Sequence, residues 1–415
     1  MKLENCNAMP APTWSWLKMN KTAFEIADDL ELAGRDAIEV EGAADCTGAA
    51  GDFAAALDDA ARRYTHRRKS APGDAADIAR VAESDEDALD VPALSSYQTE
   101  AVRLEEDCGP AESFSHGTGA GIADYLVKAA GAPVVIKLDT YQKADVTVRV
   151  NGKDDAVAAA NIQVVVAPHA ELSLTIALDS PEAGTGAVGS LLSVVAGEQA
   201  RIDVVCIQTL DDGYKALDAS GFFLDEWARV NVRQTVLGAG AAYTGLASEL
   251  WGDTSKIEVD TSYLGAREQV RDFNYSIRHL GRKTQSNMDA NGVLTGTSAK
   301  VLRGTIDLVH GCKGSEGTER ETVLIANKGV DNKTVPVILC DEDDVAGNHG
   351  ATIGHVRDEQ LFYMACRGLS PDAAENLFVR AKLEDAALSA TDERIRASVC
   401  RLGGKLVKDF EEDLV

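Results

Sequence analysis

The sequence has few aromatic residues and no long apolar run. Phe, Trp and Tyr make up 5% of the 415 residues, although apolar residues as a class reach 45%. Small and β-branched side chains must supply most of the core packing, which favours stacked short strands over a large pocket. No stretch of about 18 apolar residues occurs, so we expect no transmembrane helix and no membrane association. The N-terminus also lacks the apolar core of a secretory signal. These features predict a cytoplasmic protein.

Positive charge is scarce as well. The chain has 41 Lys and Arg against 67 Asp and Glu, which gives a formal net charge of −26. Binding to a phosphate backbone requires clustered Lys and Arg side chains. We therefore expect no nucleic acid partner.

Close cysteine pairs are missing. The eight cysteines are scattered without a CxxC spacing, which predicts free thiols in a reducing compartment and neither a zinc site nor a self-contained four-cysteine cluster. Cys340 and Cys366 are interpreted as buried core thiols. For Cys340, which lies nine residues before His349, the alternative is a thiolate ligand or a sulfur carrier. Cys312 is interpreted as a turn residue. A reactive thiol is the alternative there, because the neighbouring Lys313 would lower the pKa of Cys312.

Motifs of the common catalytic classes are also absent. The sequence contains no GxxxxGK[ST], GxSxG or HExxH motif and no GxGxxG after a strand. We expect that the chain binds no nucleotide by itself and is not a turnover enzyme. The charged group at Arg267, Glu268, Arg271 and Asp272 is expected to be a solvated surface.

A weak repeat occurs between residues 108 and 345. Each instance has a small residue followed by strand-like alternation, and the small residues are Ala170, Ala200, Ala228, Ala241, Ser255 and Ala299. Their separations are near multiples of roughly 14 to 15 residues. A unit this short cannot bury its own apolar face and must stack on its neighbours. The pattern predicts a parallel β-helix or β-solenoid in which each coil contains two such units.

We expect three regions in a mainly β protein. An N-terminal helical region spans residues 1–107, with one helix in residues 1–40, a second around Phe53 and Leu57, and an acidic Ala/Asp-rich segment after it. The β-helix core spans residues 108–345. A C-terminal helical region spans residues 346–415. Ser370 and Pro371 begin one helix, whose apolar face is predicted to contain Ala374, Leu377, Phe378 and Ala381. Thr391–Glu393 begins another helix, which Gly403–Gly404 ends.

The clearest functional signal lies in residues 334–368. A strand and an acidic turn precede Gly347-Asn348-His349-Gly350, where two glycines flank one imidazole. Glycine there predicts a sharp bend or the close approach of another chain. A neutral imidazole is an iron ligand, so His349 is a candidate ligand at a site that a second chain completes. The alternative is a structural histidine at the end of the solenoid. Gly368 is expected to stop the next helix in a left-handed cap.

This stretch resembles the C-terminal signature of the SufB/SufD family. The shared elements are D-D-V, H-G-A-T-I-G, L-F-Y and C-R-G-L-S-P, in that order. Further elements are Phe273 with His279, Gly292-Val-Leu, Gly304-Thr-Ile and Pro12-Thr-Trp-Ser-Trp-Leu-Lys. The last motif, the chain length and the lack of a cysteine just before His349 resemble the SufD branch of the family.

The resemblance implies a β-helical scaffold or accessory subunit of the SUF iron–sulfur cluster assembly system. It implies pairing with a SufB-like subunit and contact with a SufC-type ATPase. It places His349 at the subunit interface, beside a transient iron–sulfur cluster, and implies that Tyr363, Arg367 and Gly368 contact the ATPase. His279 matches a family pattern, and we interpret it as structural, with a role in a sulfur or iron path as the alternative.

Two other functions are alternatives to a SufD-like scaffold. A SufB-type scaffold that acts as a homodimer is compatible with the same motifs. A β-helical carbohydrate-active enzyme is disfavoured, because such enzymes line a groove with aromatic side chains and this chain has few. Whether a flavin binds the assembled complex is left open by the sequence.

Overall fold

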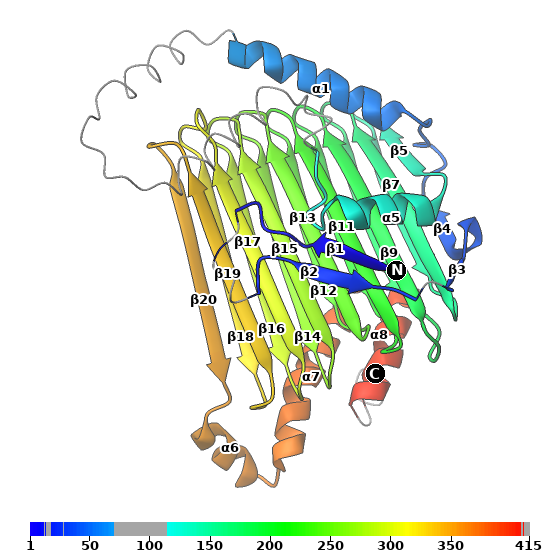
Figure 1. The fold of residues 1–415 in the computed structure, drawn as a ribbon, viewed down its shortest axis with the longest axis vertical. Coiled ribbons are helices and arrows are strands. Elements are labelled where there is room, and N and C mark those ends of the chain that lie inside the picture. The colour runs from blue at the N-terminus through cyan, green and yellow to red at the C-terminus, as the bar shows by residue number, and fades with distance from the viewer. Residues whose placement is uncertain (12, 14–17, 28, 70–113, 408–409, 411–415) are drawn as a thin grey trace.

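The computed structural model describes residues 1–11, 13, 18–27, 29–69, 114–407 and 410. Most of these residues form a parallel β-solenoid with two long sheets, and helices lie on its outer surfaces (Figure 1). The predicted fold class is therefore confirmed. Apart from a separate two-stranded pair near the N-terminus, strands with even numbers form one sheet and strands with odd numbers form the other, so we call them the even sheet and the odd sheet.

The chain alternates between the two sheets. The even sheet contains β4 (Ile38–Glu41), β6 (Lys143–Asn151), β8 (Glu171–Asp179), β10 (Arg201–Gln208), β12 (Arg229–Val236), β14 (Lys256–Gly265), β16 (Gln285–Leu294), β18 (Glu316–Ile325) and β20 (Ala346–His355). The odd sheet contains β3 (Glu31–Leu32), β5 (Val134–Leu138), β7 (Ala156–Val166), β9 (Gly186–Ala196), β11 (Tyr214–Leu224), β13 (Ala241–Leu250), β15 (Val270–His279), β17 (Ala299–Leu308) and β19 (Asp331–Cys340). Within both sheets the pairing is parallel, except that β4 runs antiparallel to β6.

The predicted half-coil repeat is present. Hydrogen-bonded residues in neighbouring coils lie 28 positions apart at Ser190 and Asp218, and 31 apart at Thr284 and Ser315. The predicted small residues occupy two equivalent corners. Ala170, Ala200, Ala228 and Ser255 directly precede β8, β10, β12 and β14, whereas Ala241 and Ala299 begin β13 and β17. A spacing of roughly 14 to 15 residues is therefore half of one coil.

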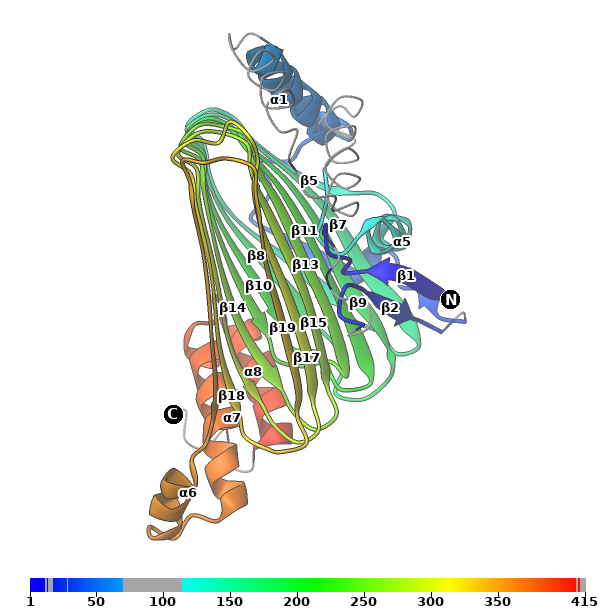
Figure 2. The ribbon, with the colours of Figure 1, turned by 60° about the vertical axis from the view of Figure 1, so that its left-hand side comes forward.

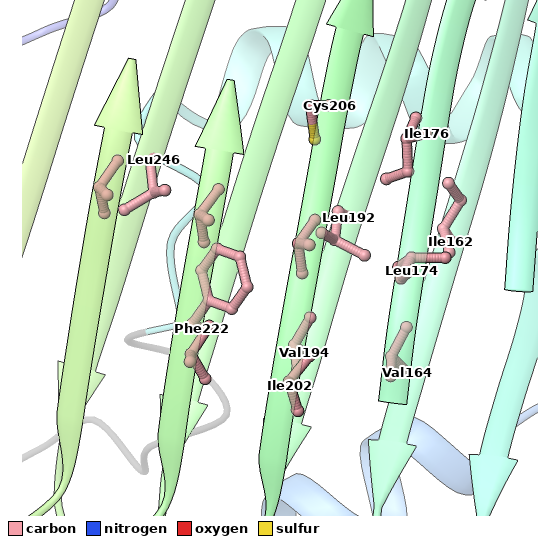
Figure 3. Packing of buried hydrophobic residues seen from close by; sticks show 14 of the residues in the cluster. Ile162, Val164, Leu174, Ile176, Leu192, Val194, Ile202, Cys206, Phe222 and Leu246 are labelled. Carbon is pink, nitrogen blue, oxygen red and sulfur yellow. The ribbon is translucent and has the colours of Figure 1, made fainter. Parts of the chain in front are cut away.

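Branched apolar side chains fill the interior between the sheets. Along β10, Ile202, Val204 and Cys206 point inward, while Asp203 is exposed on the outer face. Figure 3 shows the side chains of Ile162 and Leu192 from the odd sheet in the same cluster as those of the even sheet. A one-residue slip of any strand would turn its apolar set outward, so this core fixes the register of the coils.

The N-terminal segment covers the outer face of the odd sheet (Figure 2). It contains the antiparallel pair β1 (Lys2–Cys6) and β2 (Thr22–Glu25), the 3-10 turn η2 (Arg35–Ala37) and helix α5 (Ala120–Ala130). The helix predicted within residues 1–40 is therefore wrong. Phe24 and Ile26 are both buried two positions apart, which is the period of a strand, and they pack with Ile122 and Leu126 of α5.

A second correction concerns the charged group, because Arg271 and Asp272, predicted to be solvated, are buried. The Arg271 guanidinium donates to the backbone carbonyls of Leu237, Ala239 and Leu264. Asp272 lies beneath the N-terminal segment. The Asp272 carboxylate accepts hydrogen bonds from Asn7 Nδ2 (2.6 Å) and from Arg303 (2.6 Å). The N-terminal segment is thus tied to the odd sheet by the Asn7 hydrogen bond to a buried carboxylate, which is itself paired with Arg303 of the same sheet.

Helix α1 (Asp52–Lys69) confirms the second predicted helix. It lies across the strand ends, where Phe53, Leu57 and Tyr64 pack against Phe223. The acidic segment that follows α1, and most of the motif that begins at Pro12, lie outside the described residues.

Three helices follow the solenoid: α6 (Asp358–Ala365), α7 (Pro371–Leu388) and α8 (Glu393–Leu406). Ser370 caps α7 as predicted, since its Oγ accepts a hydrogen bond from the Ala373 N–H (3.2 Å). Helices α7 and α8 pack on the outer face of the even sheet, with Leu383 and Val399 in the same cluster as Leu264. None of the helices among the described residues is long and apolar enough to cross a membrane.

Two details of these helices differ from the prediction. Ala374 is buried and Phe378 half-buried, as predicted, whereas Leu377 and Ala381 are exposed. The other buried residues of α7 are Val379, Leu383, Ala386 and Ala387. Helix α8 also continues through Gly403 and Gly404 to Leu406, and the Phe410 ring occupies the space that a side chain at Gly403 would need.

The two ends of the solenoid differ. At the first end, β3, β4 and β5 add to the outermost strands β6 and β7. At the other end, β19 and β20 are the last strands of their sheets, and no described strand pairs with their outer edges. This second end is called the open end below (Figure 1).

Candidate functional site

The open end presents a long strand edge. Nine of the ten residues of β20 are exposed, and Gly354 is the half-buried one. An uncovered edge of this length offers a row of backbone N–H and C=O groups to another strand, which natural proteins normally prevent or use. The open end is therefore a candidate interface.

His349 lies in β20, in the strand and not in a bend. Neither Gly347 nor Gly350 has a positive φ, so the predicted sharp bend is wrong. The glycines instead leave space: a Cβ at Gly350 would meet no atom within 4 Å. Close approach of another chain at this position stays a prediction.

The face of β20 that carries His349 points into the coil. A Cβ at Gly347 would lie 3.0 Å from Cγ2 of Ile338 and 3.5 Å from Cδ1 of Leu308, both of which line the interior. By strand alternation, His349 and Ala351 share this direction. His349 is exposed because no further coil stacks on it among the described residues.

Charged residues lie inside the coil directly beneath β20. His349 pairs in register with Glu319 of β18, and Ala351 pairs with Glu321. Glu321 forms an ion pair with Lys300 of β17 and accepts a hydrogen bond from the Tyr263 hydroxyl (3.0 Å). Burial and the charge of Glu321 raise the pKa of Glu319 to about 7. Desolvation lowers the pKa of Lys300, and the Glu321 carboxylate partly offsets this effect.

Polar residues continue deeper along the interior. The Tyr275 hydroxyl donates to Gln234 Oε1 (2.6 Å), and Ser190 Oγ donates to Asp218 Oδ1 (3.0 Å). Burial raises the pKa of Asp218 to about 6, because ionisation there would place a charge in the apolar core. Buried polar groups of this kind are costly unless they are paired.

Sequence reasoning missed these interior polar residues. Asp218, Glu319 and Glu321 share one feature, which is that they occupy inward positions of strands in the solenoid interior. That feature becomes readable only when the register of each strand is known, because the sequence contains 67 acidic residues.

The cysteine predictions are mostly corrected. Cys340 and Cys366 are exposed, although both were predicted to be buried. Cys340 is the last residue of its strand at the open end, where its thiol donates to the Glu342 carbonyl (3.3 Å). Cys312 lies in the loop between β17 and β18, as predicted. However, its side chain is buried, and burial together with Glu342 raises its pKa to about 11, so the low-pKa alternative is wrong.

His279 is a structural histidine, as interpreted from the sequence. Its ring nitrogens lie 2.7 Å from Thr284 Oγ1 and 2.8 Å from Ser286 Oγ, and the residue is fully buried. Burial lowers the pKa of His279 to about 4. The ring is therefore neutral near pH 7. Through Ser286 it connects β15 of the odd sheet with β16 of the even sheet, the next strand along the chain.

Helix α6 projects from the open-end coil and buries none of its own residues. Phe362 and Tyr363 are 71% and 57% exposed. The guanidinium of Arg367 lies 3.7 Å from the centre of the Tyr363 ring, which is a cation–π contact. Gly368 has φ +85° and ends the helix as predicted. The sequence-predicted residues Tyr363, Arg367 and Gly368 thus form one exposed surface, which we call the α6 surface.

Comparisons with known proteins agree with this geometry. Residues 148–382 match the family model described as the SUF system FeS cluster assembly, SufBD core domain. The iron–sulfur cluster assembly protein SufD of Bacillus subtilis is 23% identical over 60% of this chain and 56% of its own length. SufD of Escherichia coli is 23% identical over 41% of each chain, and a SufBD family protein of Mycobacterium bovis is 26% identical over 48% of this chain and 23% of its own length. The matched part spans little more than half of these relatives at most.

Proposed function

The chain belongs to the SufB/SufD family of the SUF iron–sulfur cluster assembly system, and from this premise we propose that it is a SufD-like scaffold subunit. In this proposal its open end pairs with a SufB-like subunit. A transient iron–sulfur cluster forms at that interface, as cargo of the assembly.

The open end is the observation that carries the proposal. The first end of the solenoid is closed by additional strands, whereas β20 leaves a ten-residue edge exposed. A related solenoid that adds its own edge strand would satisfy the free backbone groups and cover the charged interior layer. The two glycines beside His349 support a close approach of backbones, because no side chain of theirs stands in the way.

His349 is the proposed cluster ligand on this chain. It lies on the inward face of the last strand, so its imidazole is covered only when a partner extends the solenoid. Imidazole nitrogen and carboxylate oxygen suit iron, and thiolates from the partner would complete the coordination. The chain contributes this ligand and an interface, and we propose no catalytic turnover for it.

The α6 surface is the proposed contact with a SufC-type ATPase. Tyr363 and Phe362 are large exposed aromatic residues on a helix that contacts α7 and buries none of its own residues. Aromatic and Arg side chains are the residue types that dominate interface energies. Movement of the ATPase subunits would then be transmitted through α6 to β20, which directly precedes it in the chain.

The first test replaces the proposed ligand. The complex is co-purified with SufB-like and SufC-type subunits, reconstituted anaerobically with iron and sulfide, and compared with His349→Ala. We expect that the variant pairs normally but loses most of the iron–sulfur absorbance and the ability to mature an apo-protein. Asn348→Ala is the matched control, since this exposed neighbour lies on the opposite face of the same strand. Undiminished absorbance and maturation in His349→Ala would refute the ligand role.

A homodimer is the second candidate assembly. The same uncovered edge is available to a second copy of the chain, and the family includes both SufB and SufD members. Multi-angle light scattering of the chain with and without a SufB-like subunit distinguishes the two. A mixed species that replaces the homodimer supports the proposed pairing.

A further inference from the structure

Two carboxylates lie inside the coil next to the open end. Glu319 and Glu321 are 4% and 2% exposed, and both point into the interior from β18. Buried carboxylates are unfavourable unless they are hydrogen-bonded, paired with a positive charge or bound to a metal ion. The two residues differ in how this requirement is met.

Glu321 is fully partnered. Lys300, itself completely buried, forms an ion pair with it, and Tyr263 and Thr334 donate hydrogen bonds to its oxygens. The charge and the hydrogen-bonding capacity of this carboxylate are thus satisfied within the chain. Glu321 is left with no need for a further ligand.

Glu319 is not partnered in this way. Its Oε2 is buried without a hydrogen-bond partner. Its Oε1 lies opposite Gly304 of β17, where a Cβ would be only 2.2 Å away, so a glycine at this position makes room for the carboxylate. Because Lys300 is engaged by Glu321, the layer holds two acidic groups and one basic group. One positive charge, from a proton or a cation, would balance it.

The free carboxylate is aligned with the exposed imidazole. Glu319 and His349 are register partners on adjacent strands and share the inward face. Parallel neighbours in a sheet lie about 4.8 Å apart, so side chains at partnered inward positions reach a common volume. The described residues contain no group of three or more acidic, Cys or His side chains able to hold a metal. A metal bound here would need further ligands beyond those that the described residues supply.

We propose that Glu319 and His349 form a two-ligand half-site for a divalent transition-metal cation at the open end. The inference rests on the proposed function for the identity of the cargo, which would be iron(II), and it adds a second ligand on this chain. One carboxylate and one imidazole are a donor pair suited to iron(II). Binding involves no redox step: the cation replaces the proton on Glu319 where the carboxyl is protonated, and the partner subunit supplies the remaining ligands.

The test uses the full chain without partners and cobalt(II) as the metal probe. Anaerobic titration is followed by the visible absorption of bound Co²⁺ and by calorimetry. We expect Glu319→Gln, which keeps the shape of the side chain, to weaken Co²⁺ binding at least tenfold, in line with the 10- to 100-fold effects of lost metal-site groups. His349→Ala should weaken it to a similar extent. Glu316→Gln is the matched control, since Glu316 is an exposed residue of the same strand and points outward.

The outcomes separate this inference from the proposed function. Wild-type affinity and an unchanged cobalt spectrum in Glu319→Gln overturn the half-site, even if His349→Ala still abolishes maturation in the complex. Conversely, Glu319-dependent cobalt binding with normal maturation in His349→Ala supports the half-site and refutes the cluster role. Circular dichroism of each variant verifies that the solenoid is intact. Should Glu319→Gln fail to fold, Glu319→Asp, which retracts the carboxylate by one methylene, gives the same comparison.

Discussion

At the scale of single residues, the interior of the solenoid is unusual in its buried acids. Asp218 lies in the apolar core with Ser190 and Gln234 as its hydrogen-bonding neighbours, and burial raises its pKa to about 6. A carboxyl group whose pKa is higher in the folded than in the unfolded protein is protonated preferentially in the folded state. Its contribution to stability is present below the unfolded pKa, near 4, and is lost as the pH rises through about 6.

Asp218→Asn should remove this pH dependence. The amide stays neutral and its oxygen still accepts from Ser190, so the wild type should lose on the order of 3 kcal/mol of unfolding free energy relative to the variant between pH 4 and pH 7. Urea denaturation at a series of pH values measures the difference. Asp203→Asn, at an exposed outward position of β10, is the control and should run parallel to the wild type. Parallel curves for Asp218→Asn would contradict the assigned pKa.

Some single residues were predictable from the sequence and others were not. The motif around His349 identified the open end, because two glycines beside one histidine are distinctive. Glu319 was not recognised, since one acid among many carries no signal until its register partner is known. The thiol predictions for Cys340 and Cys366 failed for a related reason: an apolar sequence neighbourhood does not indicate burial on the last strand or on a projecting helix.

At the scale of secondary-structure elements, α6 differs from its neighbours. Helices α7 and α8 bury apolar stripes on the even sheet, whereas α6 buries none of its residues. Its boundaries are nevertheless well defined, by Gln360 Oε1, which accepts a hydrogen bond from the Arg357 backbone N–H (3.0 Å), and by Gly368. A helix with defined ends and no core contact is suited to hold side chains for a partner.

Tyr363→Ala should weaken binding of a SufC-type ATPase about thirtyfold, equivalent to ~2 kcal/mol for an interface hot spot. The replacement removes the exposed ring and its contact with Arg367, while no core packing is lost. Leu388→Ala is the matched control, since Leu388 is 71% exposed at the end of α7. Surface plasmon resonance measures the affinity. Equal affinities of the two variants would argue against the α6 surface as the docking site.

Secondary-structure elements were predictable where the apolar residues of a segment followed a single spacing. The half-coil repeat located the solenoid strands, and caps such as Ser370 located the C-terminal helices. The N-terminal segment was misread as a helix because its few apolar residues fit either period, and only packing against α5 selects the strand.

At the scale of the whole molecule, the two ends of the solenoid differ in their strand edges, and the proposed pairing with a SufB-like subunit uses the open end. Ala351 is exposed and lies on the inward face of the edge strand. Ala351→Lys would place a charge where a partner's coil must stack, which is how natural edge strands avoid pairing. We expect the isolated variant to stay folded, since the new side chain extends into solvent.

Pairing with a SufB-like subunit should weaken at least tenfold in Ala351→Lys. Analytical ultracentrifugation of the mixed subunits measures the loss, with thermal unfolding of the isolated variant as the check on folding. Asn376→Lys, which adds the same charge at an exposed position of α7, is the control. Normal pairing by Ala351→Lys would exclude the open end as the interface.

The antiparallel strand β4 at the first end has a further consequence. A solenoid with uncovered strand edges at both ends could add a copy at each end. Head-to-tail contacts of this kind, which do not form a closed ring, produce fibres. Here β4 and its neighbours cover the strand edges at the first end. Among the described strands, the open end is then the one end that can bind a partner, and a single partner occupies it. Under the proposed pairing, the assembly would stop at two stacked solenoids without any separate terminating factor.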